Sequence, residues 1–152
     1  MGYTHYHKFA PTANTEKQFA LVLKDCAKII EAAKPKIGVF GWDEKKNGYY
    51  GEPELNSKGI AINGDESKDL DFETFIFNPK VKTAFTFCKT ARKPYDIVVC
   101  AILISLANRL DGFSFSSDGE MLSDEWIPAF RLFRDAGLRL KKGKKAEMVK
   151  WL

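Results

Sequence analysis

The sequence has no long apolar run, and this absence excludes the common membrane architectures. No stretch of its 152 residues reaches the roughly 18 consecutive apolar residues that a membrane-spanning helix needs. The first residues also lack the basic, apolar and small-residue order of a secretory signal peptide. We therefore expect a cytoplasmic protein that does not contact a membrane.

Cysteine and histidine are scarce, and their spacing argues against disulfides and metal sites. The three cysteines, Cys26, Cys88 and Cys100, stand in apolar contexts without paired spacing, so we predict reduced thiols in the core. The two histidines, His5 and His7, would lie about 7 Å apart on one side of an extended strand. No nearby acid or cysteine completes a set of metal ligands. We therefore expect neither a metal nor another cofactor.

Known phosphate-binding and catalytic motifs are also missing. The chain contains no glycine-rich phosphate loop and no nucleophile elbow. The net charge of +4 is concentrated in residues 138–152, which hold six basic residues and one acid, so the rest of the chain keeps 18 basic and 19 acidic residues. A nucleic-acid-binding domain carries its positive charge on the fold itself, so nucleic acid is a less favoured partner. We predict one domain over residues 1–137 and a basic tail over residues 138–152.

Apolar residues are plentiful enough for one core. They make up 45% of the chain, with 13% aromatic residues. Extended and alternating patterns predict strands at residues 2–9, 37–40, 60–63, 73–78, 83–88 and 112–117. Apolar residues at helical spacing predict helices at residues 15–34, 94–110 and 123–136. The predicted fold is α+β: an antiparallel or mixed sheet of about five strands, with residues 60–88 as a meander, packed with three helices in two layers.

Residues 41–59 form a polar, glycine-containing segment with three aromatic residues, Trp42, Tyr49 and Tyr50. Connections of this length are uncommon in compact domains unless they have a function. Two interpretations remain open: a mobile hairpin without chemistry, and a lid whose aromatic side chains cover a ligand.

The segment from Phe87 to Asp96 carries the clearest functional signal. Pro94 suits the first position of a helix, so the cap position falls on Lys93, which cannot accept hydrogen bonds from the exposed amides. Together with Lys89 and Arg92, Lys93 also puts positive charge at the positive end of the helix dipole, which favours a bound anion. Alternatively, Asp96 neutralises this helix end and the basic side chains are simply solvated.

Two motifs, GYTHY at residues 2–6 and FCKTARKPYD at residues 87–96, resemble those of a family of small proteins encoded by tailed phages, prophages and some bacteria. The resemblance covers most of the chain up to about residue 138. It implies no catalytic residues. It does imply an accessory protein in the cytoplasm of a bacterial host cell, and some phage proteins of this kind counter host defence by sequestering nucleotide immune signals.

The leading hypothesis is therefore a non-catalytic protein that binds a small, anionic, nucleotide-like ligand. The candidate ligand-binding residues are Lys89, Thr90, Arg92, Lys93, Tyr95, His5 and Tyr6. The basic side chains would bind phosphate, and the histidine and tyrosines would shape the pocket.

Two alternatives remain open. One is an enzyme that processes a nucleotide or phosphoester with His5 or His7 as acid or base. The other is a module that binds a host protein or nucleic acid through the tail and the aromatic residues of 41–59. The sequence is compatible with a monomer and with a homo-oligomer.

Overall fold

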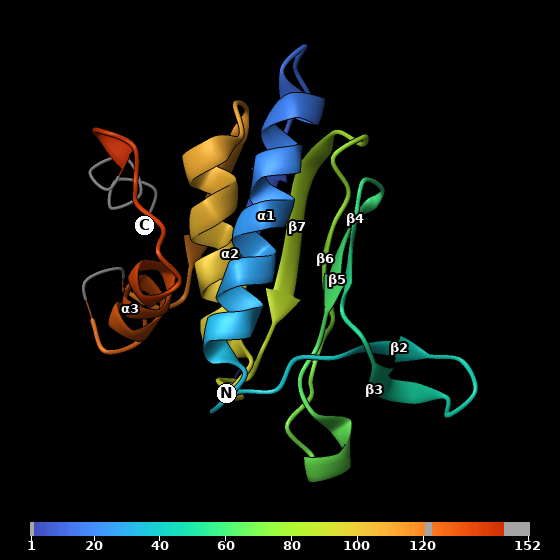
Figure 1. Ribbon diagram of the computed structural model, residues 1–152. Coiled ribbons are helices and arrows are strands. Elements are labelled where there is room, and N and C mark those ends of the chain that lie inside the picture. Colours follow the sequence, from blue (N-terminus) through green and yellow to red (C-terminus); the bar gives the residue numbers. More distant parts are fainter. Residues whose placement is uncertain (1, 121–122, 145–152) are drawn as a thin grey trace.

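The computed structural model describes residues 2–120 and 123–144, which contain three α-helices and eight short strands, six of the strands lying between the first and second helices. The helices are α1 (Thr15–Ala33), α2 (Asp96–Arg109) and α3 (Ile127–Asp135), and a 3₁₀ helix, η1 (Glu66–Lys68), lies between two strands. The strands are β1 (Thr4–Phe9), β2 (Gly41–Asp43), β3 (Gly48–Gly51), β4 (Glu54–Asn56), β5 (Gly59–Ile62), β6 (Phe75–Phe77), β7 (Thr83–Lys89) and β8 (Phe113–Ser117). Figure 1 shows α1 and α2 side by side, with the labelled strands β2 to β7 on one side of them and α3 on the other.

The strands of this described part form three small antiparallel sheets, with the orders β7-β1-β8, β4-β5-β6 and β2-β3. The predicted α+β class is confirmed, but the prediction of one sheet of about five strands is wrong. The meander predicted over residues 60–88 holds for β5 and β6 only. After the turn that follows β6, β7 pairs with β1 instead, with Tyr6 opposite Phe87.

The helix α2 forms the centre of the core because it is apolar almost all round. Its residues 98–107 are all fully buried, between α1 and α3 and against the sheet β7-β1-β8. The prediction of a central buried helix is confirmed, but the helix begins at Asp96, two residues after Pro94. The amphipathic helix predicted at 15–34 is confirmed as α1. The third helix begins at Ile127, because residues 123–126 form a turn before it.

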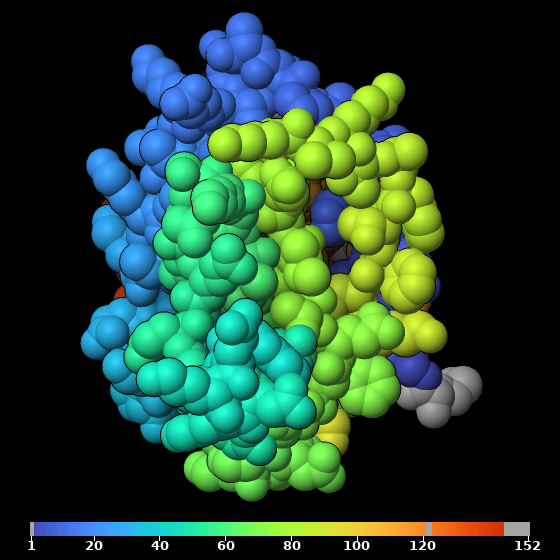
Figure 2. All heavy atoms as spheres, turned by 90° about the vertical axis from the view of Figure 1, so that its right-hand side faces the viewer, coloured from blue at the N-terminus to red at the C-terminus, as the bar shows by residue number. Residues whose placement is uncertain are grey.

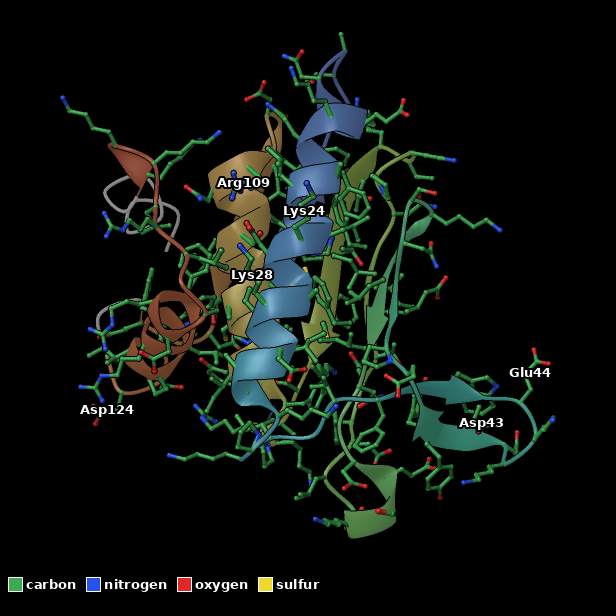
Figure 3. The ribbon with its side chains drawn as sticks, in the orientation of Figure 1. Lys24, Lys28, Asp43, Glu44, Arg109 and Asp124 are labelled. Atoms are coloured by element: carbon green, nitrogen blue, oxygen red, sulfur yellow. The ribbon has the colours of Figure 1, made fainter. Side chains whose placement is uncertain are left out.

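A polar contact joins α1 to α2. The buried carboxylate of Asp25 accepts hydrogen bonds from the Arg109 guanidinium at 2.9 and 3.0 Å and from the Ser105 hydroxyl at 2.9 Å. This bond to Asp25 raises the pKa of Arg109. Figure 3 shows Arg109 on α2 and the lysines Lys24 and Lys28 on the neighbouring α1. Directional bonds of this kind fix how the two helices are placed along each other.

Residues 41–59 contain the hairpin β2-β3 and the strand β4, so this segment has regular structure. The rings of Trp42 and Tyr49 meet edge to face at 5.3 Å, and the Tyr49 hydroxyl is hydrogen bonded to Thr74. Figure 3 shows Asp43 and Glu44 near the outer end of the hairpin, away from the helices. The strand predicted at residues 37–40 is wrong, because only one isolated bridge, from Phe40 to Asn63, forms there.

The C-terminal part of the described chain is attached to α2. Leu138 is buried in the core, and the side chain of Asn108 binds the backbone at Arg139 (3.2 Å) and at Lys141 (2.7 Å). Residues 145–152 of the predicted basic tail lie outside the described residues. No α-helix in the described ranges combines the length and apolarity needed to cross a membrane.

Candidate functional site

The two motifs at residues 2–6 and 87–96 meet in space. They belong to neighbouring strands: Thr4 and His5 of β1 lie opposite Lys89 and Cys88 of β7. Just beyond β7, the Thr90 amide donates a hydrogen bond to the Tyr3 carbonyl at 3.1 Å. The segment that leads into α2 is therefore fixed to the first strand.

A tight turn connects β7 to α2, and its backbone is in an unfavourable conformation. The Lys93 amide donates to the Thr90 carbonyl at 3.0 Å, and the two central residues, Ala91 and Arg92, have φ angles of 53° and 56°. Turns with two central residues at positive φ strongly prefer glycine and asparagine. The left-handed region costs other L-residues on the order of 1–2 kcal/mol each. The surrounding contacts must therefore hold this turn in place.

The basic side chains of the turn all have partners within the protein. The Arg92 guanidinium lies 4.2 Å from the centre of the Tyr3 ring and forms an ion pair with Glu125 at 3.0 Å. The Lys93 ammonium donates to the carbonyl of Asp69 at 3.1 Å. These two side chains point to different neighbours and do not converge on one position.

The start of α2 receives its negative charge from the protein itself. Tyr95 takes the cap position without a side-chain hydrogen bond, so the expectation of an uncapped start holds while the expected cap residue, Lys93, is wrong. Asp96, in the first turn, is only 6% exposed. Its carboxylate lies where a helix dipole favours an anion. This arrangement agrees with the alternative in which Asp96 neutralises the helix end.

A buried polar cluster surrounds this carboxylate. His5, which is 2% exposed, places its Nε2 atom 2.6 Å from Asp96 Oδ1. The Thr90 hydroxyl donates to the same oxygen at 2.6 Å. On the other side of the imidazole, Nδ1 lies 2.8 Å from Ser117 Oγ. The candidate residues His5 and Thr90 therefore share a partner inside the core and offer no surface to a ligand.

Cys100, one helical turn after Asp96, completes this buried cluster. Its sulfur lies 3.4 Å from His5 Nε2 and 3.7 Å from Asp96 Oδ2. Burial, with the nearby charge of Asp96, raises the pKa of the Cys100 thiol well above its usual range. One ligand atom each from His5, Asp96 and Cys100 lie within 4.8 Å of one another, so these three residues could hold a metal ion.

Aromatic rings enclose the histidine. Tyr3 and Trp126 both meet the His5 ring edge to face, at 5.0 and 5.4 Å, and the Trp126 indole donates to Ser117 Oγ at 3.1 Å. The Tyr3 hydroxyl is buried beside Ser117, and burial raises its pKa. Among the described residues, no group meets this hydroxyl with hydrogen-bond geometry.

The remaining candidates lie apart from one another. Tyr95 is fully buried and donates to the Glu73 carbonyl at 2.5 Å. Tyr6 and Lys89 lie on the other side of the sheet β7-β1-β8, because side chains alternate along a strand. The structure therefore separates the predicted site into a buried group, a turn and an open sheet face.

We call this open side of the sheet the aromatic face. Its side chains are Tyr6 and Lys8 of β1, Phe85, Phe87 and Lys89 of β7, and Ser114 and Ser116 of β8. Phe85 and Phe87 are 65% and 50% exposed. The Tyr6 and Phe85 rings stack at 5.7 Å with 27° between their planes, and the Lys89 ammonium lies 5.8 Å from the centre of the Phe87 ring.

A shallow hollow of about 280 Å³ lies on this face. Its lining includes Tyr6, Lys8, Phe85 and Ser116. The Tyr6 hydroxyl donates to Asp118 at 3.1 Å, and this bond raises the Tyr6 pKa. Figure 2 shows an opening between the green strands and the yellow β7, with blue N-terminal atoms at its bottom. This opening is distinct from the hollow, which is lined by residues of β1, β7 and β8.

The sequence contains a signal for the aromatic face that the predicted site did not include. Phe85 and Phe87 alternate with smaller residues in the predicted strand at 83–88, and neither was among the candidate residues. Which of the two sides faces water depends on how the strand pairs, and the pairing of β7 with β1 was not predicted.

Comparison of the chain with protein-family models, with curated proteins and with solved structures finds no match. The function must therefore be inferred from the residues themselves.

Proposed function

We propose that the protein binds a small, anionic, nucleotide-like ligand on the aromatic face. The base would stack on the rings of Phe85 and Phe87, and the phosphate would pair with Lys8 or Lys89. The observation that carries this proposal is the exposure of two phenylalanine rings beside lysines on an open sheet.

The exposure of these rings favours a binding role. Burying a phenylalanine side chain contributes about 1.5–3 kcal/mol to stability, so leaving two largely exposed in one patch forgoes a substantial gain. Such patches on a soluble domain often mark binding sites. Open sheets that present aromatic side chains are used to stack nucleic-acid bases, and each stacked base contributes about 1–3 kcal/mol.

The size and charge of the face favour a small ligand. A hollow of about 280 Å³ is slightly smaller than the roughly 300–1,000 Å³ of ligand pockets. It therefore suits one nucleotide unit better than a long polymer. Lys8 and Lys89 are exposed on β1 and β7, on the same side as the rings, where they could reach a phosphate.

The turn before α2 is a weaker location for the same ligand. Arg92 already pairs with Glu125, and Asp96 occupies the start of the helix. His5 and His7 are both buried, so neither meets a surface ligand as an acid or a base. These observations favour a binding protein over the enzyme alternative.

The proposal is tested by calorimetric titration with ATP, cyclic di-AMP and ADP-ribose at low and physiological ionic strength. We expect at least one to bind, and Phe85→Ala and Phe87→Ala to weaken its binding by about 5- to 150-fold each, since stacking is worth about 1–3 kcal/mol. Lys89→Ala should reduce both the affinity and its dependence on salt.

Two controls separate the two locations. Phe72→Ala removes an aromatic side chain of similar exposure from the loop before β6, and it should leave binding unchanged. The double substitution Arg92→Ala/Lys93→Ala should also retain binding; if it abolishes binding while Phe85→Ala does not, the ligand binds at the turn and the aromatic face is the wrong site. If none of the three nucleotides binds, or a single-stranded oligonucleotide binds far more tightly, a small nucleotide-like ligand is excluded.

A further inference from the structure

We propose that His5, Asp96 and Cys100 bind a zinc ion in the interior of the protein. The ligand atoms would be Nε2 of the imidazole, a carboxylate oxygen and the thiolate sulfur. This inference is independent of the aromatic face, which lies on the other side of β1.

The three ligand groups approach the spacing of a zinc site, although the imidazole and the sulfur lie nearest to different oxygens of the Asp96 carboxylate. With one atom taken from each residue, the ligand atoms lie within 4.8 Å of one another. A tetrahedral zinc ion with bonds of about 2.0–2.3 Å holds neighbouring ligand atoms roughly 3.3–3.6 Å apart. Cys100 Sγ lies 3.4 Å from His5 Nε2 and 3.7 Å from Asp96 Oδ2. The pair His5 Nε2 and Asp96 Oδ1, at 2.6 Å, is at hydrogen-bond distance and must open by roughly 0.7 Å when the ion replaces the shared proton.

All three ligand residues lie in regular secondary structure and none lies in a loop. Asp96 and Cys100 are four residues apart on α2, which places both on one side of the helix. His5 lies in β1, the middle strand of its sheet. Ligands on a helix and a central strand are held more rigidly than ligands on loops.

Two of the three ligand side chains, His5 and Asp96, are themselves held by hydrogen bonds to neighbouring hydroxyl groups. The Thr90 hydroxyl donates to the Asp96 carboxylate at 2.6 Å, and Ser117 Oγ lies 2.8 Å from His5 Nδ1. In most metal sites the second imidazole nitrogen donates a hydrogen bond. Ser117 Oγ already accepts from the Trp126 indole at 3.1 Å and from the Gly119 amide at 3.0 Å, so a metal ion at Nε2 would make the Nδ1 proton a third donor to this oxygen. One of these two bonds must therefore lengthen when the ion binds.

The chemistry of the set favours zinc over calcium or magnesium. A thiolate and an imidazole are ligands of zinc, whereas calcium and magnesium prefer oxygen alone. One thiolate and one carboxylate also balance the two charges of the ion inside the core, where an unbalanced charge is costly. Three protein ligands leave the fourth position of a tetrahedral ion to water or another small ligand.

One of the three proposed zinc ligands is far from the other two in the sequence, so their spacing does not reveal a metal site. His5 stands 91 residues before Asp96. Only the packing of α2 on β1 brings the histidine to its partners. The sequence near the histidines contains no further metal ligands, as expected. In the folded chain, however, Asp96 and Cys100 lie beside His5.

The test uses the full chain purified without a histidine tag, with Co²⁺ as a spectroscopic substitute for zinc. We expect one equivalent to give thiolate-to-cobalt charge-transfer absorption and the visible bands of a four-coordinate ion, and Zn²⁺ to abolish both. Cys100→Ser should remove the charge-transfer band, and His5→Gln and Asp96→Asn should each weaken Co²⁺ binding at least tenfold. Cobalt-edge absorption of the wild-type protein should show one sulfur ligand, a result that does not depend on whether any variant folds.

The chain supplies matched controls of the same residue types. Cys26 is a fully buried thiol on α1, and His7 is a buried histidine on the same side of β1 as His5. Cys26→Ser and His7→Gln should keep the cobalt spectrum. The absence of sulfur from the cobalt coordination of the wild-type protein would overturn the proposal. It would also be overturned if Cys26→Ser lost the cobalt spectrum while Cys100→Ser kept it.

Discussion

His7 is a buried histidine surrounded by aromatic rings, and its position makes stability depend on pH. Its ring stacks on Phe113 at 5.5 Å and lies about 6 Å from Phe75 and Phe77. Burial lowers its pKa from 6.5 to about 4. The imidazole is therefore neutral in the folded protein at pH values where the unfolded chain already binds a proton.

This shift predicts a loss of stability in mild acid. Because the unfolded chain takes up a proton at His7 near pH 6.5 and the folded protein only near pH 4, the free energy of unfolding should fall as the pH drops between these values. The contribution of His7 should be on the order of 2–3 kcal/mol. Urea denaturation at pH 7.5 and at pH 4.5 measures it, and His7→Phe should show a smaller fall than the wild-type protein. Equal falls in both proteins would show that His7 does not carry this effect.

The turn between β7 and α2 is the element whose local sequence conflicts most with its conformation. Ala91 adopts a φ of 53°, which costs an L-residue roughly 1–2 kcal/mol and glycine almost nothing. Ala91→Gly should therefore raise the free energy of unfolding, by up to about 1 kcal/mol after the greater flexibility of glycine in the unfolded chain is counted.

The same substitution in a helix, where the backbone is unstrained, should have the opposite effect on the free energy of unfolding. Ala20 is exposed in the middle of α1, and Ala20→Gly should lower the free energy of unfolding by about 1 kcal/mol. Thermal or urea denaturation distinguishes the two signs. If both substitutions destabilise the protein equally, the turn is not strained.

At the scale of the whole molecule, the structure extends beyond the domain predicted over residues 1–137. Leu138 is buried, and its amide donates to the Phe133 carbonyl at 3.2 Å. We expect Leu138→Ala to lower the free energy of unfolding by about 2–3 kcal/mol, as for other leucines removed from a core. Lys142→Ala, at an exposed position four residues later, should change it by less than about 0.5 kcal/mol. Equal, small effects would mean that the segment is only loosely attached.

The sequence predicted the local elements of this molecule well and their partners less well. α1 and α2 were predictable because helical periodicity is a property of neighbouring residues. The pairing of β7 with β1, and the approach of Cys100 to His5, depend on contacts between residues far apart in the chain. The same limit applies to the aromatic face, because the outward side of β7 is set by its partner strand. The two motifs lie on neighbouring parts of the fold, but their candidate residues are divided among the buried cluster, the turn before α2 and the aromatic face.

The central position of β1 has a consequence for how this molecule can vary. His5 and Tyr6 are consecutive, yet one belongs to the buried cluster and the other to the aromatic face. A substitution on one side leaves the other side in place, so the two surfaces can change their chemistry separately. Insertion or deletion of a single residue within β1 would instead exchange them, turning Tyr6 and Lys8 into the core and His5 into water. The number of residues in this strand is therefore under a stricter constraint than the identity of any one side chain on it.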